Sequence, residues 1–271
     1  MNIFDIIVLQ PIINVLVVIY HALIALNVPY ALGFAIILLT VLIRFALYPL
    51  TASQIKTQKK MSDIAPHLSK LKEKHKGDMR RQQEATMALY REHGVNPAAG
   101  CLPALLQLPI FFGLYSVLQK AVSVKATADI NKFLYSDSLN IKSVWDSTFF
   151  GLPLGKNPGE LISTVGPAIL LLVVTTGILQ FVQSKMMAPA MVDQKTNLPA
   201  VKEEKKSDFA GIMQTQMLYM LPIMIGVFSY GFPIGLSLYW NTFSLFGIIQ
   251  QYVISGWGGL SPWIDKLKNK A

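Results

Sequence analysis

Residues 30–50 read YALGFAIILLTVLIRFALYPL, an apolar run in which Arg44 is the single charge. A helix rises 1.5 Å per residue, so about 20 apolar residues cross the roughly 30 Å hydrocarbon core of a bilayer. The run therefore predicts a helix that spans a membrane. Lysines begin soon after it, in the sequence 51–61, so Arg44 is expected roughly 9 Å from the charged end of the span.

Four further stretches are as apolar and contain no Asp or Glu: residues 101–119, 161–183, 213–230 and 232–255. The chain as a whole is 52% hydrophobic and 14% charged, whereas soluble domains carry about 25% charged residues. Because nearly all the charge lies between the apolar stretches, the sequence predicts an all-α polytopic membrane protein. Its five core transmembrane helices are 29–50 and the four stretches above.

The N-terminal segment, residues 1–28, is also apolar but is interrupted by polar residues. Gln10, Asn14 and His21 are spaced by four and seven, so they line one face of a helix. A helix with one polar stripe can lie in the interface, so we predict an interfacial helix on the external face. A span is the alternative, since residues 27–29 are short enough to turn a hairpin. No signal-peptide pattern is present, so the chain is expected to begin at its native start.

The lysines and arginines predict how the chain is oriented. Residues 51–100 carry ten of them, 184–212 five, the tail 256–271 three, and 120–160 five. Loops rich in Lys and Arg stay in the cytoplasm. The loop 51–100 carries twice as many as 120–160, which has a similar length. The segments 51–100, 184–212 and 256–271 are therefore predicted to be cytoplasmic, and 120–160 to be an external loop. The N-terminus then lies outside, and the C-terminus lies in the cytoplasm, of a multi-pass protein of the cytoplasmic (inner) membrane. This orientation accounts for the net charge of +9 without nucleic-acid readout.

The first cytoplasmic loop, 51–100, has a helical pattern of its own. Residues 52–75 and 79–93 are rich in polar and basic residues, with apolar residues at roughly helical spacing. The sequence Lys-Gly-Asp at 76–78 is a turn signal, and Gly94 is a typical helix terminator. The loop is therefore predicted to be a basic, amphipathic helical hairpin.

The sequence contains no pattern that indicates catalytic chemistry. No glycine-rich loop precedes a Lys-Ser or Lys-Thr pair, no HExxH motif occurs, and Cys101 is the single cysteine. The spans hold no acidic residue of the kind that proton relays use, and nothing resembles a catalytic triad. We therefore expect no catalytic residue, no metal ion and no cofactor, and a protein that is not an enzyme.

Arg44 is the unusual residue of the spans. A charge at the bilayer centre costs about 2.5–3.5 kcal/mol on insertion scales. At its expected depth the side chain can snorkel, lying along its own helix to reach the phosphates. The alternative is that Arg44 faces a hydrated, positively charged cavity inside the bundle. Position alone leaves both interpretations open.

Polar residues in the spans favour the cavity. Arg44 is joined by five candidate groove residues: Thr40, Gln107, Gln180, Trp240 and Asn241. Each by itself fits an ordinary contact between helices, but together with an arginine they indicate an inward-facing polar surface. Such a groove would attract the acidic segment of a client chain and shorten the apolar barrier that it meets. Partitioning of the client's apolar helix into lipid would supply the driving force without a nucleotide.

Three stretches resemble the YidC family of membrane protein insertases, which has relatives in mitochondria and chloroplasts. They are ILLTVLIRFALYPLTASQIKTQKKM (37–61), ALYREHGVNPAAGCLPALLQLPIFFGLY (88–115) and FPIGLSLYWNTFSLFGIIQQYV (232–253). The resemblance extends over about residues 4–256 and is to bacterial short forms without a large external domain. It implies five core helices around a hydrophilic groove that is closed outside and opens to the cytoplasm and to lipid.

The resemblance also implies roles for particular residues. Arg44 falls on the family's groove arginine, Thr40 and Trp240 fall on positions that contact client segments, and Gln180 falls on the groove wall. Residues 51–93 match the hairpin that the family uses to recruit clients and to meet targeting factors. The expected partners are nascent membrane proteins, the lipid bilayer, the Sec translocon, the ribosome and the signal recognition particle receptor. The expected function is to insert and fold small membrane proteins, alone or beside the translocon.

Two other functions are compatible with much of the same sequence. A channel or solute transporter would need a through-pore or an ion-coupled site, and the acid-free spans without an evident inverted repeat argue against it. A scaffold would assemble other membrane proteins without inserting them. The family is also credited with chaperoning, so the insertase and the scaffold both stay open at this point.

Overall fold

The computed structural model describes residues 2–75, 77–96, 102–121, 126–142, 146–188 and 209–269. Helices dominate these residues, and the strands within them are one antiparallel pair of two residues each, β1 (Thr148–Phe149) and β2 (Leu152–Pro153). The predicted all-α class is therefore confirmed. The chain forms two compact units. Unit 1 comprises Met1–Tyr48, Pro103–Gln180 and Met224–Phe246, and unit 2 comprises Pro49–Leu102, Phe181–Ile223 and Gly247–Ala271.

Unit 1 holds the N-terminal helices together with residues 103–180 and 224–246. Its elements are η1 (Asp5–Leu9), α1 (Gln10–Ala25), α2 (Ala31–Ala46), α5 (Leu102–Ala121), α6 (Ala126–Asn131), η3 (Asp137–Leu139), β1, β2, α7 (Pro158–Val165) and η4 (Pro167–Ile169). It also contains most of α8 (Leu170–Met187) and parts of α9 (Phe209–Gly231) and α10 (Ile234–Ser255).

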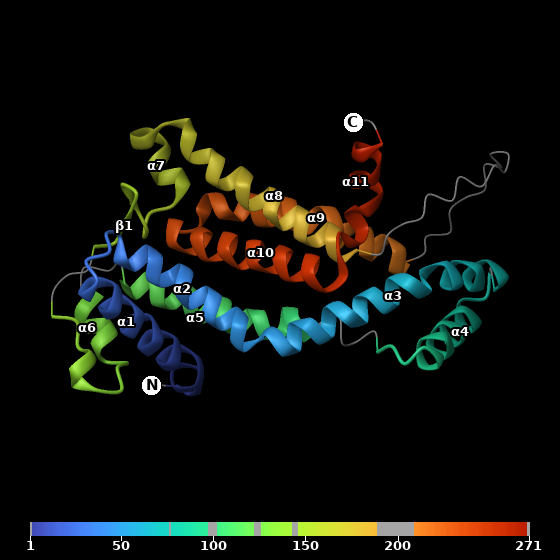
Figure 1. Cartoon of the computed structure of the whole chain (residues 1–271), viewed down its shortest axis with the longest axis horizontal. Helices are drawn as coiled ribbons and strands as arrows, with labels where there is room; N and C mark the ends of the chain where they lie inside the picture. The colour runs from blue at the N-terminus through green and yellow to red at the C-terminus, as the bar shows by residue number, and fades with distance from the viewer. Residues whose placement is uncertain are drawn as a thin grey trace. The chain divides into compact units, whose positions relative to one another are not determined.

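A tight turn joins α1 to α2, so that α2 runs back beside α1 (Figure 1). Asn27 has a φ of 54° and closes the end of α1. The backbone N–H of Val28 donates to the carbonyl of Leu23 at 3.0 Å, and the N–H of Asn27 donates to that of Ile24 at 2.9 Å. This is the hydrogen-bond pattern of a helix end with a left-handed residue, and asparagine tolerates that conformation better than most residues.

The core of unit 1 is built from side chains of several helices that lie far apart in the sequence. Fully buried residues come from α1, α2, α5 and α10: Ile13, Leu16, Ile36, Leu114, Leu118, Leu236 and Tyr239. Apolar residues also cover the opposite faces, where Val15, Val18 and Leu38 are exposed. A helix that is apolar all round is typical of a membrane protein, because lipid replaces water around it.

Asn14 is buried, although the sequence places it on a polar stripe of the N-terminal helix. Its side chain is 5% exposed. Its Nδ2 donates to the carbonyl oxygens of Gln10 and Phe133, both at 2.8 Å, and its Oδ1 accepts from the backbone N–H of Tyr135 at 2.9 Å. One polar side chain thus fastens α1 to the segment that follows α6, which explains its presence among apolar neighbours.

Two helices of the described residues are long and apolar enough to cross a membrane, namely Asp5–Ala25 and Pro167–Met187. Ala31–Ala46 and Tyr48–Leu71 are long and apolar enough only when they are taken together. They give a third span if this bent pair counts as one. The five core spans of the sequence analysis therefore stay a prediction. The first helix also meets the length of a span, so both interpretations of residues 1–28 stand.

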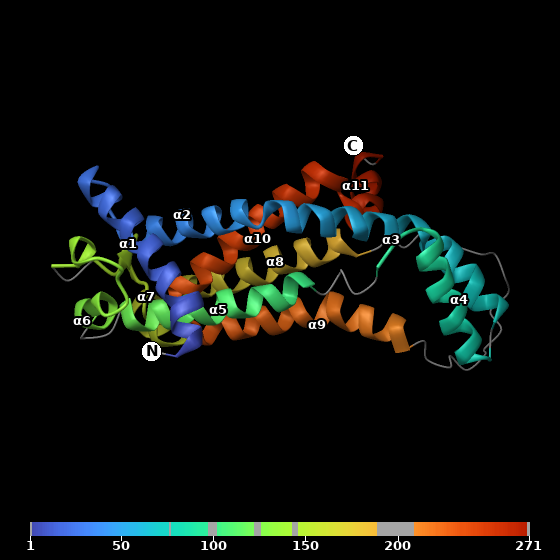
Figure 2. The same cartoon turned by 90° about the horizontal axis from the view of Figure 1, so that it is seen from below.

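Unit 2 contains the hairpin and the C-terminal helix. Its elements are α3 (Tyr48–Lys74), α4 (Met79–Glu92), η5 (Gly258–Leu260) and α11 (Ser261–Lys268), with the adjoining ends of α8, α9 and α10. Figure 2 shows α4 folding back beside the end of α3. Nε2 of Gln82 donates to the carbonyl of His75 at 3.0 Å, and the rings of His67 and His93 lie 6.3 Å apart.

Side-chain and backbone caps define both ends of α4. Oδ1 of Asp78 accepts from the backbone N–H of Arg81 at 3.0 Å, which satisfies a free donor of the first turn. Gly94 has a φ of 61°, and the N–H of Val95 donates to the carbonyl of Tyr90 at 2.8 Å. These are the residues that the sequence analysis used to place the turn and the helix end.

Candidate functional site

The side chain of Arg44 leaves α2 and meets α10 within unit 1. It is 4% exposed. Its Nη2 donates to the carbonyl oxygen of Phe243 at 2.5 Å, and its guanidinium carbon lies 3.4 Å from the centroid of the Phe243 ring. The ring of Phe246 is 5.9 Å from the same carbon. Arg44 therefore points at a neighbouring helix and, in this structure, does not snorkel along its own helix.

The charge of Arg44 is only partly compensated. Among the described residues it forms no ion pair, and its Nε is buried without a hydrogen-bond partner. A cation over a desolvated aromatic ring gains about 2 kcal/mol, which is less than the several kcal/mol that burial of an ion costs. The site thus keeps a positive charge that a negatively charged group would stabilise.

Thr40 lies one turn before Arg44 on α2 and is 0% exposed. Its Oγ1 donates to the carbonyl of Ile36 in its own helix at 2.6 Å. The hydroxyl proton is therefore used locally, whereas the oxygen keeps a lone pair that can accept a further hydrogen bond. This places an acceptor beside the arginine without a separate charge.

Gln107 of α5 connects to the same face of α10 through an aromatic residue. Its Nε2 donates to the hydroxyl oxygen of Tyr239, which is 0% exposed. The ring of Tyr239 lies 5.8 Å from that of Phe243, the ring under Arg44. Sequence reasoning missed Tyr239 and Phe243. Their spacing of four residues was a usable signal, since it puts both rings on one face of α10.

Gln180 and Trp240 form a second direct pair. Nε1 of the Trp240 indole donates to Oε1 of Gln180 at 3.0 Å, joining α10 to α8. The indole also meets the ring of Phe111 edge-on, with the centroids 5.5 Å apart. Trp240 is half-buried. Its ring packs on Phe111 and its N–H bonds to Gln180, an arrangement typical of aromatic residues that have both an apolar and a polar part.

Asn241 belongs to a row of unsatisfied oxygens along α10. Ser237, Asn241 and Ser244 are spaced by four and three, so they lie on one face. Oγ of Ser237, Oδ1 of Asn241 and Oγ of Ser244 are buried and have no hydrogen-bond partner among the described residues. Each such atom costs about 1–3 kcal/mol unless a partner satisfies it. The row therefore offers acceptors that the described residues leave unused.

The six residues singled out from the sequence all lie in unit 1. Arg44 and Gln107 are linked through α10, Trp240 and Gln180 are bonded to each other, and Thr40 and Asn241 carry polar atoms on α2 and α10. We call these six, with Tyr239 and Phe243, the Arg44 cluster. Arg44, Thr40 and Tyr239 are buried in this structure, whereas the other members of the cluster are half-buried.

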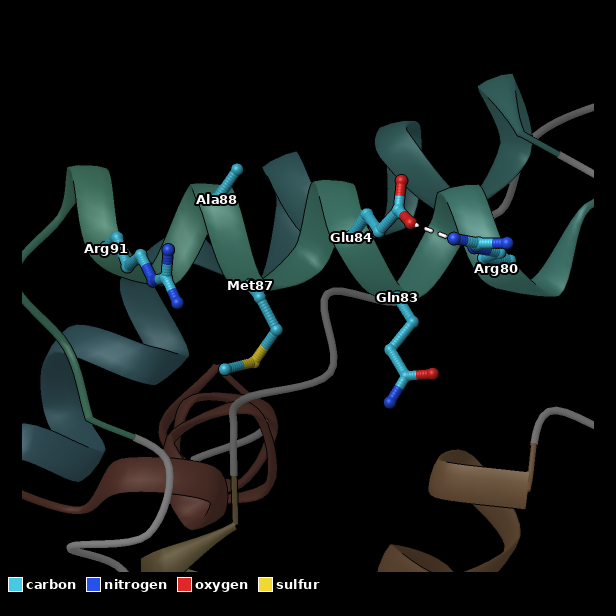
Figure 3. Close-up of a pocket in the computed structure, with 6 residues that line it drawn as sticks. All are labelled: Arg80, Gln83, Glu84, Met87, Ala88 and Arg91. Carbon is cyan, nitrogen blue, oxygen red and sulfur yellow. Dashed lines mark hydrogen bonds and ion pairs between the residues drawn. The ribbon is translucent and has the colours of Figure 1, made fainter.

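A shallow hollow lies elsewhere, on α4 of unit 2. Its lining residues all come from this one helix: Arg80, Gln83, Glu84, Met87, Ala88 and Arg91. Figure 3 shows Arg80 bonded to Glu84 (Nε to Oε1, 3.2 Å), and Gln83 pointing away from the helix. Exposed ion pairs of this kind contribute little to stability. Among the described residues no group of three or more His, Cys, Asp and Glu can hold a metal ion.

Taken together, the fold and the Arg44 cluster define a polytopic helical membrane protein with a charge buried against aromatic rings. The family model described as 60Kd inner membrane protein matches residues 23–258. The membrane protein insertase YidC of Fusobacterium nucleatum is 36% identical over 222 residues, which cover 82% of this chain and 85% of the relative. The chain therefore belongs to the 60Kd inner membrane protein family, that of the YidC membrane protein insertases.

Other relatives match this chain at similar identity, and the match covers different shares of their own length. The membrane protein insertase MisCA of Bacillus subtilis is 34% identical, over 83% of this chain and 70% of the relative. The chloroplastic inner membrane protein ALBINO3 of Arabidopsis thaliana is 33% identical, over 94% of this chain but 53% of the relative. The crystal structure of an active YidC insertase with its first transmembrane domain resolved matches with a TM-score of 0.53 at 25% identity. That match covers 87% of this chain and 46% of the solved chain.

Proposed function

We propose that this protein inserts and folds small membrane proteins, alone or with the Sec translocon, by offering the Arg44 cluster to the client's hydrophilic segment. The observation that carries the proposal is the burial of Arg44, 4% exposed, with no acidic partner among the described residues. A lone buried charge is expensive, and its retention is understandable if a negatively charged group visits it. The acidic tail of a client is such a group.

The contacts of Arg44 suggest how the cluster admits a client. One hydrogen bond and one ring contact with Phe243 hold the guanidinium, and both can be exchanged for a carboxylate, which Arg binds through two parallel hydrogen bonds. At 4 Å and an effective dielectric constant of 20 the attraction is about 4 kcal/mol. The unsatisfied oxygens of Ser237, Asn241 and Ser244 then accept backbone N–H groups of the client.

No catalytic step is required in this account. Leu, Ile, Phe and Val each favour the bilayer by about 0.3–0.6 kcal/mol at the centre of a helix, so a client span of about 20 such residues supplies several kcal/mol. The protein lowers the barrier for the polar segment, and the apolar segment moves into lipid. We therefore propose that the protein is not an enzyme and uses no cofactor.

The orientation follows the positive-inside rule. We place the hairpin 51–100, the loop 184–212 and the tail 256–271 in the cytoplasm, with the N-terminus outside. The exposed basic residues of α4, among them Arg80 and Arg81, then face the side on which clients are made. Basic residues attract acidic surfaces, and we propose the ribosome or the signal recognition particle receptor as their partner.

Reconstitution into lipid vesicles tests the proposal. A client with one apolar helix and a short acidic tail is expected to become resistant to external protease in vesicles that contain the protein, and to remain accessible in empty vesicles. A trapped small dye serves as the control, because an insertase is expected to retain it. Dye release without protection of the client would instead identify a channel.

A further inference from the structure

The first turns of α3 bury amide side chains. Thr51, Gln54 and Gln58 are spaced by three and four, so they share one face of the helix. Gln54 is 5% exposed and Gln58 is half-buried, whereas Ser53 and Lys56 on the other side are exposed. A polar helix ordinarily turns its glutamines to water and its apolar residues to the core. The burial of Gln54 and Gln58 is contrary to this pattern.

Gln250 of α10 meets this face of α3 within unit 2. Its side chain is 3% exposed, and its Nε2 donates to Oγ1 of Thr51 at 2.6 Å. Three buried amide atoms have no hydrogen-bond partner among the described residues: Nε2 of Gln54, Oε1 of Gln58 and Oε1 of Gln250. We call Gln54, Gln58 and Gln250 the amide cluster.

The unsatisfied atoms of the amide cluster define what can bind there. Buried polar groups nearly always have a partner in native proteins, so one donor and two acceptors indicate a guest that offers both kinds of group. A peptide unit has one N–H and one C=O, the same pair that a glutamine amide carries. Neutral amides hold no net charge, so they do not select a guest by its charge.

We propose that the amide cluster binds the backbone of a client's hydrophilic segment, whatever the charge of its side chains. A backbone carbonyl of the client accepts from Nε2 of Gln54, and backbone N–H groups donate to Oε1 of Gln58 and of Gln250. The proposal rests on the insertase function and adds a second, neutral site to it. Each backbone group left unpaired in lipid costs several kcal/mol, so every client needs such contacts, including those that Arg44 does not attract.

The test removes the amides without changing the size of the side chains. The variant Gln54→Met/Gln58→Met and the wild type are reconstituted into vesicles with two clients that share one apolar helix and differ in carrying a neutral or an acidic tail. We expect protease-protected product to fall about tenfold for both tails, since two hydrogen bonds are lost. Gln119→Met is the matched control, because Gln119 is exposed on α5, and it is expected to insert both clients like wild type.

Stability and a second variant exclude a folding defect. The two methionines remove the unsatisfied amide atoms of Gln54 and Gln58, so the double variant is expected to melt at the wild-type temperature or above it. If it melts lower, Gln58→Met alone is used, since Gln58 is only half-buried, and an approximately threefold loss for both tails is expected.

The outcomes separate this proposal from the insertase function. Full insertion of both tails by the methionine variants would mean that the cluster holds water only, and would overturn the inference. If Arg44→Ala still inserted less of the client with the acidic tail than wild type did in that experiment, the proposed function would stand. A wild-type protein that inserted neither client would overturn the proposed function and this inference with it.

Discussion

Replacing Arg44 by alanine is expected to lower insertion of a client with an acidic tail about tenfold or more. The guanidinium is buried and has no acidic partner among the described residues, so none of their carboxylates competes with that of a client. Loss of about 1.4 kcal/mol from an attraction of about 4 kcal/mol already gives a tenfold effect. The measurement is the amount of protease-protected client in vesicles, or growth of cells that are depleted of their own insertase.

Arg44→Lys and a second client provide the controls. Lysine keeps the charge but loses the planar stacking on Phe243 and the forked donors, so a loss of about threefold is expected for the acidic tail. A client with a neutral tail is expected to insert equally well with all three proteins. Equal insertion of the acidic client by wild type and Arg44→Ala would show that the charge has no role, even if the protein remained an insertase.

Gly258→Ala is expected to lower the free energy of unfolding by roughly 2–4 kcal/mol. Gly258 has a φ of 51°, a conformation that costs other residues about 1–2 kcal/mol. A Cβ there would also overlap the carbonyl oxygen of Met186, a backbone atom that cannot rotate away. Thermal unfolding in detergent, followed by circular dichroism, measures the loss. We expect the packing of η5 against the end of α8 to be disturbed, directly before α11 begins.

Gly256→Ala is the matched control for this prediction. Gly256 also has a positive φ, 71°, but nothing lies within 4 Å of the position of its Cβ. The backbone strain alone is expected to cost about 1 kcal/mol. If both alanine variants lost the same stability, the close approach of Gly258 to Met186 would not be what fixes this junction.

Hydropathy predicted the helical class and most helices, because a helix surrounded by lipid appears in the sequence as a long run of apolar residues. Residues 101–119 correspond to α5, Leu102–Ala121. The break after Ala46, with α3 beginning at Tyr48, was not predicted, because the apolar run continues across it. Pro49 was the available signal, since proline is favoured in the first turn of a helix. The sequence Ser261-Pro262 likewise marks the start of α11, which the sequence analysis treated as part of a tail.

The residues of the site were predictable by type but not by partner. A charge and amides in apolar helices stand out in any sequence. That Arg44 lies on Phe243, or that Trp240 bonds to Gln180, depends on how each helix is rotated about its axis. Such rotation is set by packing among many apolar side chains, which carry no individual signal. The buried face of Gln54 and Gln58 escaped notice for the same reason, because glutamines in a basic helix ordinarily face water.

Site-specific photocrosslinking tests the central claim, that the Arg44 cluster opens to receive a client. A photoreactive side chain is placed at Thr40, at Trp240, or at Leu171, which is 68% exposed on α8 and serves as the control. With a stalled nascent client, adducts are expected from positions 40 and 240, although Thr40 is 0% exposed without a client, and not from position 171. Absence of adducts from both cluster positions, or equal adducts from position 171, would contradict the account.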